Sequence, residues 1–174
     1  KSGTVLGINW MYDTDELFFD YELPDTEILT KRMFLSAIAT IFDPAGMIAF
    51  AIVPAKLLLQ NAFRRNLRWD EELPDDIRCE IERWTMAMGR LKELRIPRSL
   101  SGSSSSPVVD RQLHLFSDSS EAAYASNCFL RSRHEDGSIT CSLVATKNRL
   151  APLRTKITVP RLELNGCLLS ARLA

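Results

Sequence analysis

A low-complexity segment at residues 98–107, RSLSGSSSSP, divides the chain into two halves with different hydrophobic periods. Segments rich in serine and glycine lack the apolar side chains that a packed core needs. Before this segment, apolar residues recur mainly at the three- and four-residue spacing of helices, and after it strand-like segments dominate. The sequence therefore predicts an α+β protein of two regions joined by a flexible linker.

The first half is predicted to begin with a β-hairpin and to continue as helices. Strand-forming residues at 4–10 and 17–21 flank an acidic turn at residues 13–15. Thr30 is a good N-cap for the first helix, in which Phe34, Ile38 and Ile41 share one face. The predicted helices and the short strand that follows them are 31–42, 52–66 (with Pro54 in its first turn), 75–93 and 94–97.

The second half is predicted to have the order β-β-β-α. The turn residues at 134–137 join the second and third strands as a hairpin. A basic loop at 148–158 comes next, and Pro160 marks the start of the last helix. The three strands and the helix are expected at 112–117, 123–131, 138–147 and 161–173.

Composition indicates an ordinary globular protein, with 45% hydrophobic and 25% charged residues. No apolar run is long enough for a membrane span, and the N-terminus has no signal peptide, so we expect an intracellular, cytoplasmic chain without a membrane partner. The absence of an initial Met suggests that the chain is cut from something longer. The four cysteines form no CxxC pair, so we expect reduced, mostly buried thiols and no zinc site.

The net charge is zero, but charge is unevenly distributed. Residues 1–30 and 69–94 carry net charges of −6 and −4, whereas residues 31–68 and 95–174 each carry +5. The two basic blocks permit contact with nucleic acid without proving it.

Two carboxylates in the second half are candidate metal ligands. Asp118 follows a predicted strand, and Glu163 lies in the first turn of the predicted last helix. Carboxylate oxygens suit Mg²⁺, but a pair of ions about 3.5–4 Å apart normally needs more than two carboxylates. From spacing alone, the simpler interpretation is that Asp118 caps a turn and Glu163 caps a helix.

A basic run lies between these carboxylates. Residues 147–161 contain five bases and no acid, namely Lys147, Arg149, Arg154, Lys156 and Arg161. Bases beside a metal site would contact a phosphate backbone. The alternative from the residues alone is a solvated, charged loop.

Several stretches, in the right order, give the chain a resemblance to the pol polyprotein of LTR retrotransposons of the BEL/Pao class. In the first half, the similar stretches are TVLGINW at 4–10, TKRMFLSAIATIFDPAG at 30–46, AKLLLQ at 55–60, LRWD at 67–70 and LPD at 73–75. At the end of the first half, LRIPR at 94–98 resembles the entry to the nuclease. FSDSSEAAY at 116–124 and TVPRLEL at 158–164 resemble the first two carboxylate motifs of its ribonuclease H domain.

The resemblance implies a role for each region. It makes residues 1–97 similar to the reverse transcriptase thumb and connection, 98–110 a linker, and 111–174 a partial, truncated ribonuclease H-like domain. Asp118 matches the first catalytic aspartate and Glu163 the glutamate of the first long helix. The two later aspartates of the family's site and the polymerase's aspartate pair have no counterpart in this chain.

The activity that the resemblance implies belongs to the parent polyprotein. The parent would copy RNA to DNA and would hydrolyse the RNA strand of an RNA–DNA hybrid with two Mg²⁺ ions held in part by Asp118 and Glu163. This chain alone is expected to be inactive. Its expected partners are an RNA–DNA hybrid and the rest of the pol polyprotein.

Two other functions remain open from the sequence. The chain is alternatively a non-catalytic nucleic-acid-binding module, or a structural protein with no nucleic-acid role. For the thumb-like bases, contact with a template–primer backbone and a solvated helix face are equally good interpretations; these bases are Lys31, Arg32, Lys56, Arg64, Arg65 and Arg68. We expect Trp10, Trp69 and Trp84 to be core anchors rather than platforms for base stacking.

Overall fold

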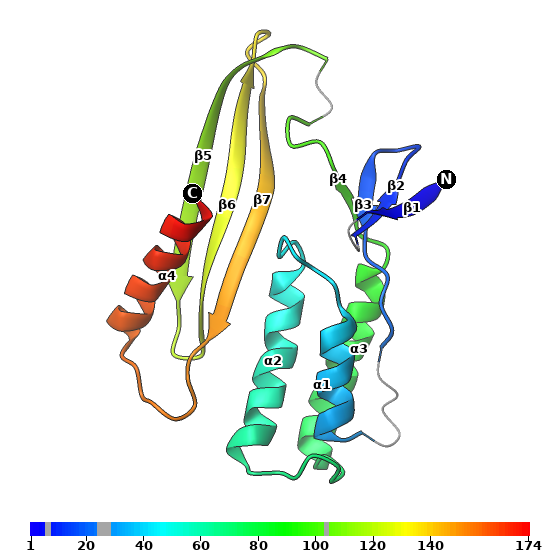
Figure 1. The fold of residues 1–174 in the computed structure, drawn as a ribbon, viewed down its shortest axis with the longest axis vertical. Coiled ribbons are helices and arrows are strands. Elements are labelled where there is room, and N and C mark those ends of the chain that lie inside the picture. Colours follow the sequence, from blue (N-terminus) through cyan, green and yellow to red (C-terminus); the bar gives the residue numbers. More distant parts are fainter. Residues whose placement is uncertain (6–7, 24–28, 103–104) are drawn as a thin grey trace. The chain divides into compact units, whose positions relative to one another are not determined.

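The computed structural model describes residues 1–5, 8–23, 29–102 and 105–174 of the chain. These residues form two compact units, one of Lys1–Asp43 and Phe50–Ile96 and the other of Pro44–Ala49 and Pro97–Ala174. The first unit contains a small sheet and three helices, and the second contains a long three-stranded sheet and one helix (Figure 1). The predicted α+β class is confirmed.

The small sheet of the first unit has four strands in chain order. They are β1 (Ser2–Val5), β2 (Ile8–Met11), β3 (Glu16–Phe18) and β4 (Arg95–Pro97). β1 and β2 are antiparallel, with Thr4 opposite Asn9. The prediction of one strand over residues 4–10 is therefore wrong, and residues 6–7 lie outside the described residues. Composition did not reveal the reversal, because both arms of the hairpin carry strand-forming side chains.

The hairpin predicted around residues 13–15 is confirmed between β2 and β3. Asp15 has a φ of 55°, a left-handed conformation that aspartate tolerates better than most residues. Its carboxylate accepts a hydrogen bond of 3.0 Å from the indole nitrogen of Trp10. β3 ends at Phe18, so the predicted strand over 17–21 is too long, and Phe19 and Tyr21 are buried instead.

Three helices supply most of the core of the first unit. They are α1 (Lys31–Thr40), α2 (Ala49–Arg64) and α3 (Asp75–Leu91). The hydroxyl of Thr30 accepts a hydrogen bond from the backbone N–H of Met33, which confirms the predicted cap. Their largest fully buried side chains, taken with the adjoining segment, are Leu29, Phe34, Ile77, Ile81 and Met88.

The ends of these helices differ from the prediction. α1 and α3 each end two residues early, while α2 begins three residues early and ends two residues early. Pro54 therefore lies inside α2 and not in its first turn, where a proline would be tolerated most easily. The predicted break at residues 24–27 lies outside the described residues.

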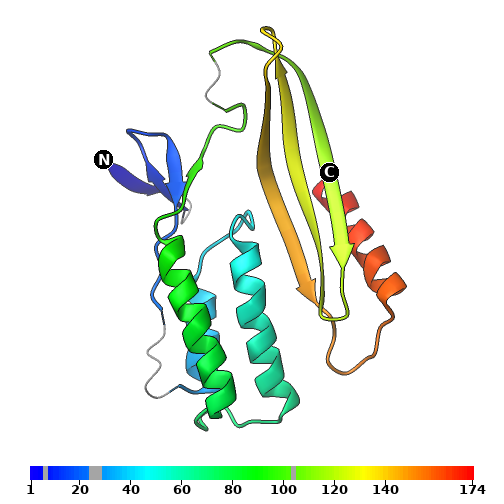
Figure 2. The same cartoon turned by 180° about the vertical axis from the view of Figure 1, so that it is seen from behind.

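The second unit is a β-β-β-α arrangement. Its antiparallel strands are β5 (Val108–Ser119), β6 (Ala123–His134) and β7 (Ile139–Leu150), and its helix is α4 (Val159–Leu173). Figures 1 and 2, which view the unit from opposite sides, show α4 against one face of the sheet. Each strand is longer than predicted, because polar residues continue the backbone pairing past the apolar segment.

The serine-rich segment before β5 is anchored to the turn between β6 and β7. His134 is only 1% exposed, and its Nδ1 lies 2.8 Å from the carbonyl oxygen of Ser106. Its Nε2 lies 3.2 Å from the hydroxyl of Thr140, which in turn donates to the carbonyl oxygen of Ser101. The described part of the predicted flexible linker is therefore held by specific hydrogen bonds.

All four cysteines are free thiols, as expected. The expectation that most of them are buried is wrong, because only Cys128 is buried, while Cys79, Cys141 and Cys167 are exposed. No helix in the described part of the chain is long and apolar enough to cross a membrane.

Candidate metal and nucleic-acid site

Asp118 is the penultimate residue of β5 and is exposed to solvent. One of its carboxylate oxygens accepts a hydrogen bond of 2.8 Å from the backbone N–H of Ser119. The register pairs Asp118 with Ala125 and the preceding Ser117 with Ser126. Because successive side chains in a strand point to opposite faces, Asp118 and Ser117 project from different faces of the sheet.

Glu163 is exposed on α4, which begins at Val159. Glu163 therefore lies in the second turn, and its predicted place in the first turn is wrong. The difference arises because Pro160 is inside the helix, at one of its first two positions, and not before it. A carboxylate in the second turn is not needed to cap the helix, so the simple capping interpretation of Glu163 loses its basis.

The contact between α4 and β5 brings the segments that carry these carboxylates together. A Cβ atom added to Gly166 would lie 3.3 Å from the Cβ of Ser117 and 3.7 Å from the carbonyl oxygen of Asp118. The thiol of Cys167 lies 3.7 Å from the hydroxyl of Ser117. Glu163 lies four residues before Cys167, so both side chains are on the same side of the helix.

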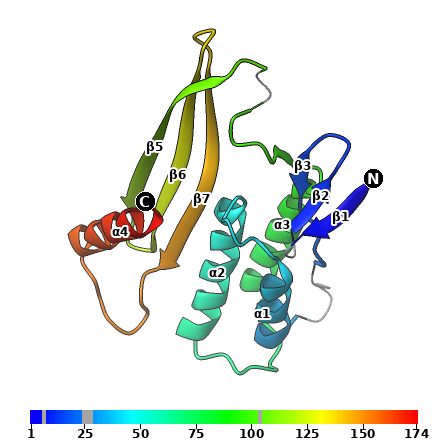
Figure 3. The same ribbon diagram turned by 45° about the horizontal axis from the view of Figure 1, so that its top comes forward.

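This contact also fixes which face of the sheet α4 covers. The hydroxyls of Ser126 and Ser170 lie 2.8 Å apart, so the face that carries Ser117 and Ser126 is the one under α4. Figure 3 shows α4 lying across β5, and α4 contacts both β5 and β6. Asp118 thus lies at the end of β5 and projects from the other face, while Glu163 approaches the same strand from the helix side.

Carboxylate chemistry at this end of the sheet suits Mg²⁺, which prefers oxygen ligands. Within the described residues, however, no group of three or more His, Cys, Asp or Glu side chains is arranged to hold a metal ion. Asp118 and Glu163 are two carboxylates on adjacent elements, and they approach this end of β5 from different faces of the sheet. Their role as ligands stays a prediction.

The five predicted nucleic-acid contacts surround the connection between β7 and α4. Lys147 and Arg149 lie on β7, so the predicted basic loop begins only at Ala151. Arg154 and Lys156 lie in that loop, and Arg161 is in the first turn of α4. All five side chains are exposed, and none forms an ion pair within the part of the chain that the structure describes. They are therefore available to bind phosphate.

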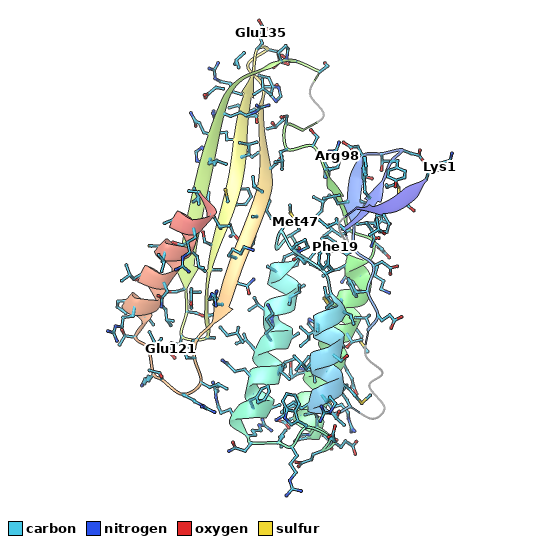
Figure 4. The ribbon with its side chains drawn as sticks, in the orientation of Figure 1. Lys1, Phe19, Met47, Arg98, Glu121 and Glu135 are labelled. Atoms are coloured by element: carbon cyan, nitrogen blue, oxygen red, sulfur yellow. The ribbon has the colours of Figure 1, made fainter. Side chains whose placement is uncertain are left out.

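The N-terminus of α4 adds to the positive character of this region. Thr158 is the N-cap residue of α4, but its side chain makes no capping hydrogen bond to the backbone N–H groups of the helix. The first turn of the helix contains no acidic residue. Free N–H groups and the helix dipole favour an anion at such an end. An open pocket of about 510 Å³ lies beside it and is lined by Lys156, Thr158 and Glu121 among others; Glu121 is labelled in Figure 4.

Comparison with known protein families identifies the family of this chain. A family model described as the Pao retrotransposon-like RNaseH-like domain matches residues 30–174, most of the chain. The chain belongs to this family. The predicted resemblance to BEL/Pao retrotransposons is thereby confirmed. A search of curated proteins found no match.

The match to the Pao retrotransposon RNaseH-like domain covers more than the sheet and α4. It begins at residue 30, so it also includes α1, α2 and α3. The strands β1, β2 and β3 precede it. The family assignment supports a ribonuclease H-like fold and a general association with nucleic acid, and it leaves the catalytic details as predictions.

Three of the bases compared above with a polymerase thumb interact with other residues of the first unit. Lys31 is 4% exposed, and its ammonium donates a hydrogen bond to the carbonyl oxygen of Leu67. The same ammonium lies over the rings of Phe63 and Trp69, 4.2 Å and 4.8 Å from their centroids. Neither interpretation left open for Lys31, contact with a template–primer backbone or a solvated helix face, agrees with the burial of its side chain.

Two other thumb-like bases are paired at the surface. The guanidinium of Arg32 donates two hydrogen bonds to the carboxylate of Asp70, and that of Arg65 donates two to Asp76. These hydrogen bonds lower the pKa of both carboxyl groups. Lys56, Arg64 and Arg68 are exposed and keep both interpretations open.

The three tryptophans mostly act as anchors of the first unit, as expected. Trp84 is buried, packs edge-on against Phe34, and donates to the carbonyl oxygen of Ala51. Trp10 is half-buried and bonded to Asp15. Trp69 is 40% exposed, but its ring packs against Phe63 and the ammonium of Lys31.

One feature of this site, a bulge in β7, has no signal in the amino-acid pattern. Cys128 pairs with Ala145 and Phe129 pairs with Leu143, so Val144 is an extra residue in β7. Such a bulge reverses the faces of all later residues in the strand. Lys147 consequently lies opposite Ser126, on the face that α4 covers, where an unbulged strand would have placed it on the other face.

Proposed function

We propose that the second unit is part of a ribonuclease H-like site that binds the phosphate backbone of an RNA–DNA hybrid and holds Mg²⁺ through Asp118 and Glu163. The parent polyprotein would cleave the RNA strand of this hybrid and would also copy RNA to DNA. The observation that carries the proposal is the packing of α4 on β5. It puts the side of the helix that bears Glu163 against the residue that precedes Asp118.

The electrostatics of the region support the binding step. Five exposed bases and an uncapped helix N-terminus gather at the end of the sheet where Asp118 is found. Phosphate contacts from lysine, arginine and helix N-termini position a nucleic acid without reading its sequence. Lys147, Arg149, Arg154, Lys156 and Arg161 would therefore bind the backbone of the hybrid, with affinity that falls as salt rises.

The two carboxylates would orient the scissile phosphate by way of the metal. A bound Mg²⁺ would supply an activated water and would stabilise charge on the phosphate oxygens. Asp118 and Glu163 would hold the ion, and the bases would keep the backbone in place. Since the two-ion arrangement normally needs further carboxylates, we propose that this chain binds a hybrid but does not cleave it.

Binding is tested with a fluorescent RNA–DNA hybrid and the full chain at several salt concentrations. Charge reversal at Lys147, Arg149, Arg154 and Lys156 should weaken binding by more than tenfold and should flatten its salt dependence. Charge reversal at Arg83 and Arg90, which are exposed on α3 in the first unit, is the control and should have little effect. Unchanged affinity after the first set of reversals would point to a protein with no nucleic-acid role.

Cleavage and metal binding are tested separately. The unsubstituted chain with Mg²⁺ should give no cleavage above background, and cleavage that disappears in Asp118→Asn would contradict the proposed inactivity. Mn²⁺, used as a paramagnetic probe, should broaden NMR signals near residues 118 and 163. Asp118→Asn and Glu163→Gln should each abolish that broadening.

A second candidate function is a nucleic-acid-binding module without catalysis. The lack of a three-ligand metal cluster within the described residues favours it. In that case the hybrid binds with the expected salt dependence, Mn²⁺ broadens no signal at either carboxylate, and Asp118→Asn changes nothing.

A further inference from the structure

The connection between α1 and α2 packs against the edge of the long sheet. Residues Pro44–Ala49 belong to the second unit, although the helices that they join lie mainly in the first. The carbonyl oxygen of Ala45 accepts a hydrogen bond of 2.7 Å from the backbone N–H of Thr146 in β7. β7 is an edge strand, so this bond satisfies a backbone group that the sheet itself leaves unpaired.

Gly46 makes this approach possible. It has a φ of +72°, and a Cβ atom at this position would lie 2.2 Å from the carbonyl oxygen of Thr146. That atom belongs to the backbone of a paired strand and has no flexible side chain to move aside. A helix-ending turn explains the positive φ of Gly46, but it does not explain this contact.

Thr146 is also held from the other side. Its hydroxyl donates a hydrogen bond of 2.9 Å to the side-chain oxygen of Asn127 in β6. The bulge at Val144 lies two residues earlier, at the point where the faces of β7 are reversed. The turn and Asn127 therefore hold β7 two residues after its irregular residue and directly before Lys147.

We infer that the Pro44–Ala49 turn is a positioning element for the basic end of β7. By holding Thr146 it fixes the bulged register, and that register presents Lys147 and Arg149 on the face shared with Ser126 and Tyr124. What these bases bind rests on the proposed function, whereas the anchoring and the register do not. The competing role is a simple edge cover, which blocks pairing with another strand and leaves the bases where they are.

The test compares two glycines in the full chain. Gly46 and Gly137 both have a positive φ, of 72° and 84°, but a Cβ atom on Gly137 would meet nothing within 4 Å. Gly46→Ala and Gly137→Ala thus share the backbone strain, and only the former pushes the turn away from β7. Gly46→Asn is a third variant, because asparagine tolerates the left-handed region and yet carries the Cβ atom.

Three measurements are made on each variant. Amide hydrogen exchange at Thr146 should accelerate about tenfold in Gly46→Ala and Gly46→Asn, as expected when one hydrogen bond is lost. Cross-strand NOEs from Lys147 and Arg149 to Ser126 and Tyr124 should weaken or disappear. Affinity for the RNA–DNA hybrid should fall about three- to tenfold because the phosphate contacts are misplaced. Gly137→Ala should leave all three unchanged.

Protected exchange at Thr146 in both Gly46 variants would overturn the anchor. Faster exchange with intact NOEs would overturn the positioning role and would leave an edge cover. If the unsubstituted chain binds no hybrid, the proposed function fails, while the exchange and NOE measurements still decide the inference.

Discussion

Gly166 in α4 lies so close to Ser117 in β5 that a Cβ atom on residue 166 would sit 3.3 Å from the Cβ of Ser117. This contact holds the helix with Glu163 against the strand with Asp118. We predict that Gly166→Leu lowers the free energy of unfolding by about 1–3 kcal/mol through overpacking. In Gly89→Leu, the control, the side chain enters open space in α3 and should stabilise the chain slightly through helix propensity. Urea unfolding measures both, and equal stability of the two variants would refute the close contact.

The buried imidazole of His134 should anchor the segment before β5. His134→Phe removes the donor to the carbonyl oxygen of Ser106, and the loss should lower the free energy of unfolding by about 1–3 kcal/mol. It should also speed proteolysis within residues 98–107. His114 is exposed, so His114→Phe should change neither result. Similar protease sensitivity in both variants would show that His134 does not hold this segment.

The buried ammonium of Lys31 should stabilise the first unit without binding nucleic acid. Lys31→Met keeps the apolar stem but loses the bond to Leu67 and the contact with two aromatic rings, which should lower stability by about 1–3 kcal/mol. Hybrid affinity should stay the same. Lys56→Met, at an exposed position, should leave stability unchanged. Thermal unfolding and hybrid binding check both expectations, and weaker binding in Lys31→Met alone would contradict them.

The turn between β6 and β7 should loosen in acid. The hydroxyl and backbone N–H of Ser138 donate to Asp136 and lower the pKa of its carboxyl. Because the pKa is lowered in the folded state, the ionised carboxylate stabilises the turn above its ordinary pKa of 3.8, and this contribution is lost as pH falls through the lowered value. NMR titration of the carboxyl carbon measures this pKa. Ser138→Ala should raise it toward 3.8, whereas Ser120→Ala in the turn between β5 and β6 should not move it.

Local patterns in the sequence predicted elements whose cause is local. Thr30 caps α1, and Ile77, Ile81, Trp84 and Met88 repeat on the buried face of α3, because capping and helical periodicity depend on residues within a few positions of each other. The strand prediction was wrong for residues 4–10. Thr4 and Asn9 were predicted to lie in one strand, but they face each other in two antiparallel strands. Strand-forming composition is the same on both sides of a reversal.

The candidate site likewise has features that the sequence predicted and features that it did not. The motifs around Asp118 and Glu163 indicated the family, and the match over residues 30–174 bears this out. The place of Glu163 in the second turn and the face on which Lys147 lies were not predictable. Both depend on where a helix starts or a strand bulges, and a shift of one residue is enough to turn a side chain to another face.

The sequence by itself determined the class of fold, the family and the residue types available for binding phosphate and metal. Only the tertiary structure decided which of them are accessible and how they are presented. In the folded chain Lys31 is buried against two aromatic rings, and the ring of His134 is hydrogen-bonded to the carbonyl oxygen of Ser106. Gly46 contacts Thr146, which lies a hundred residues later in the chain. Contacts between distant segments have no period in the sequence, because they arise only when packing brings those segments together.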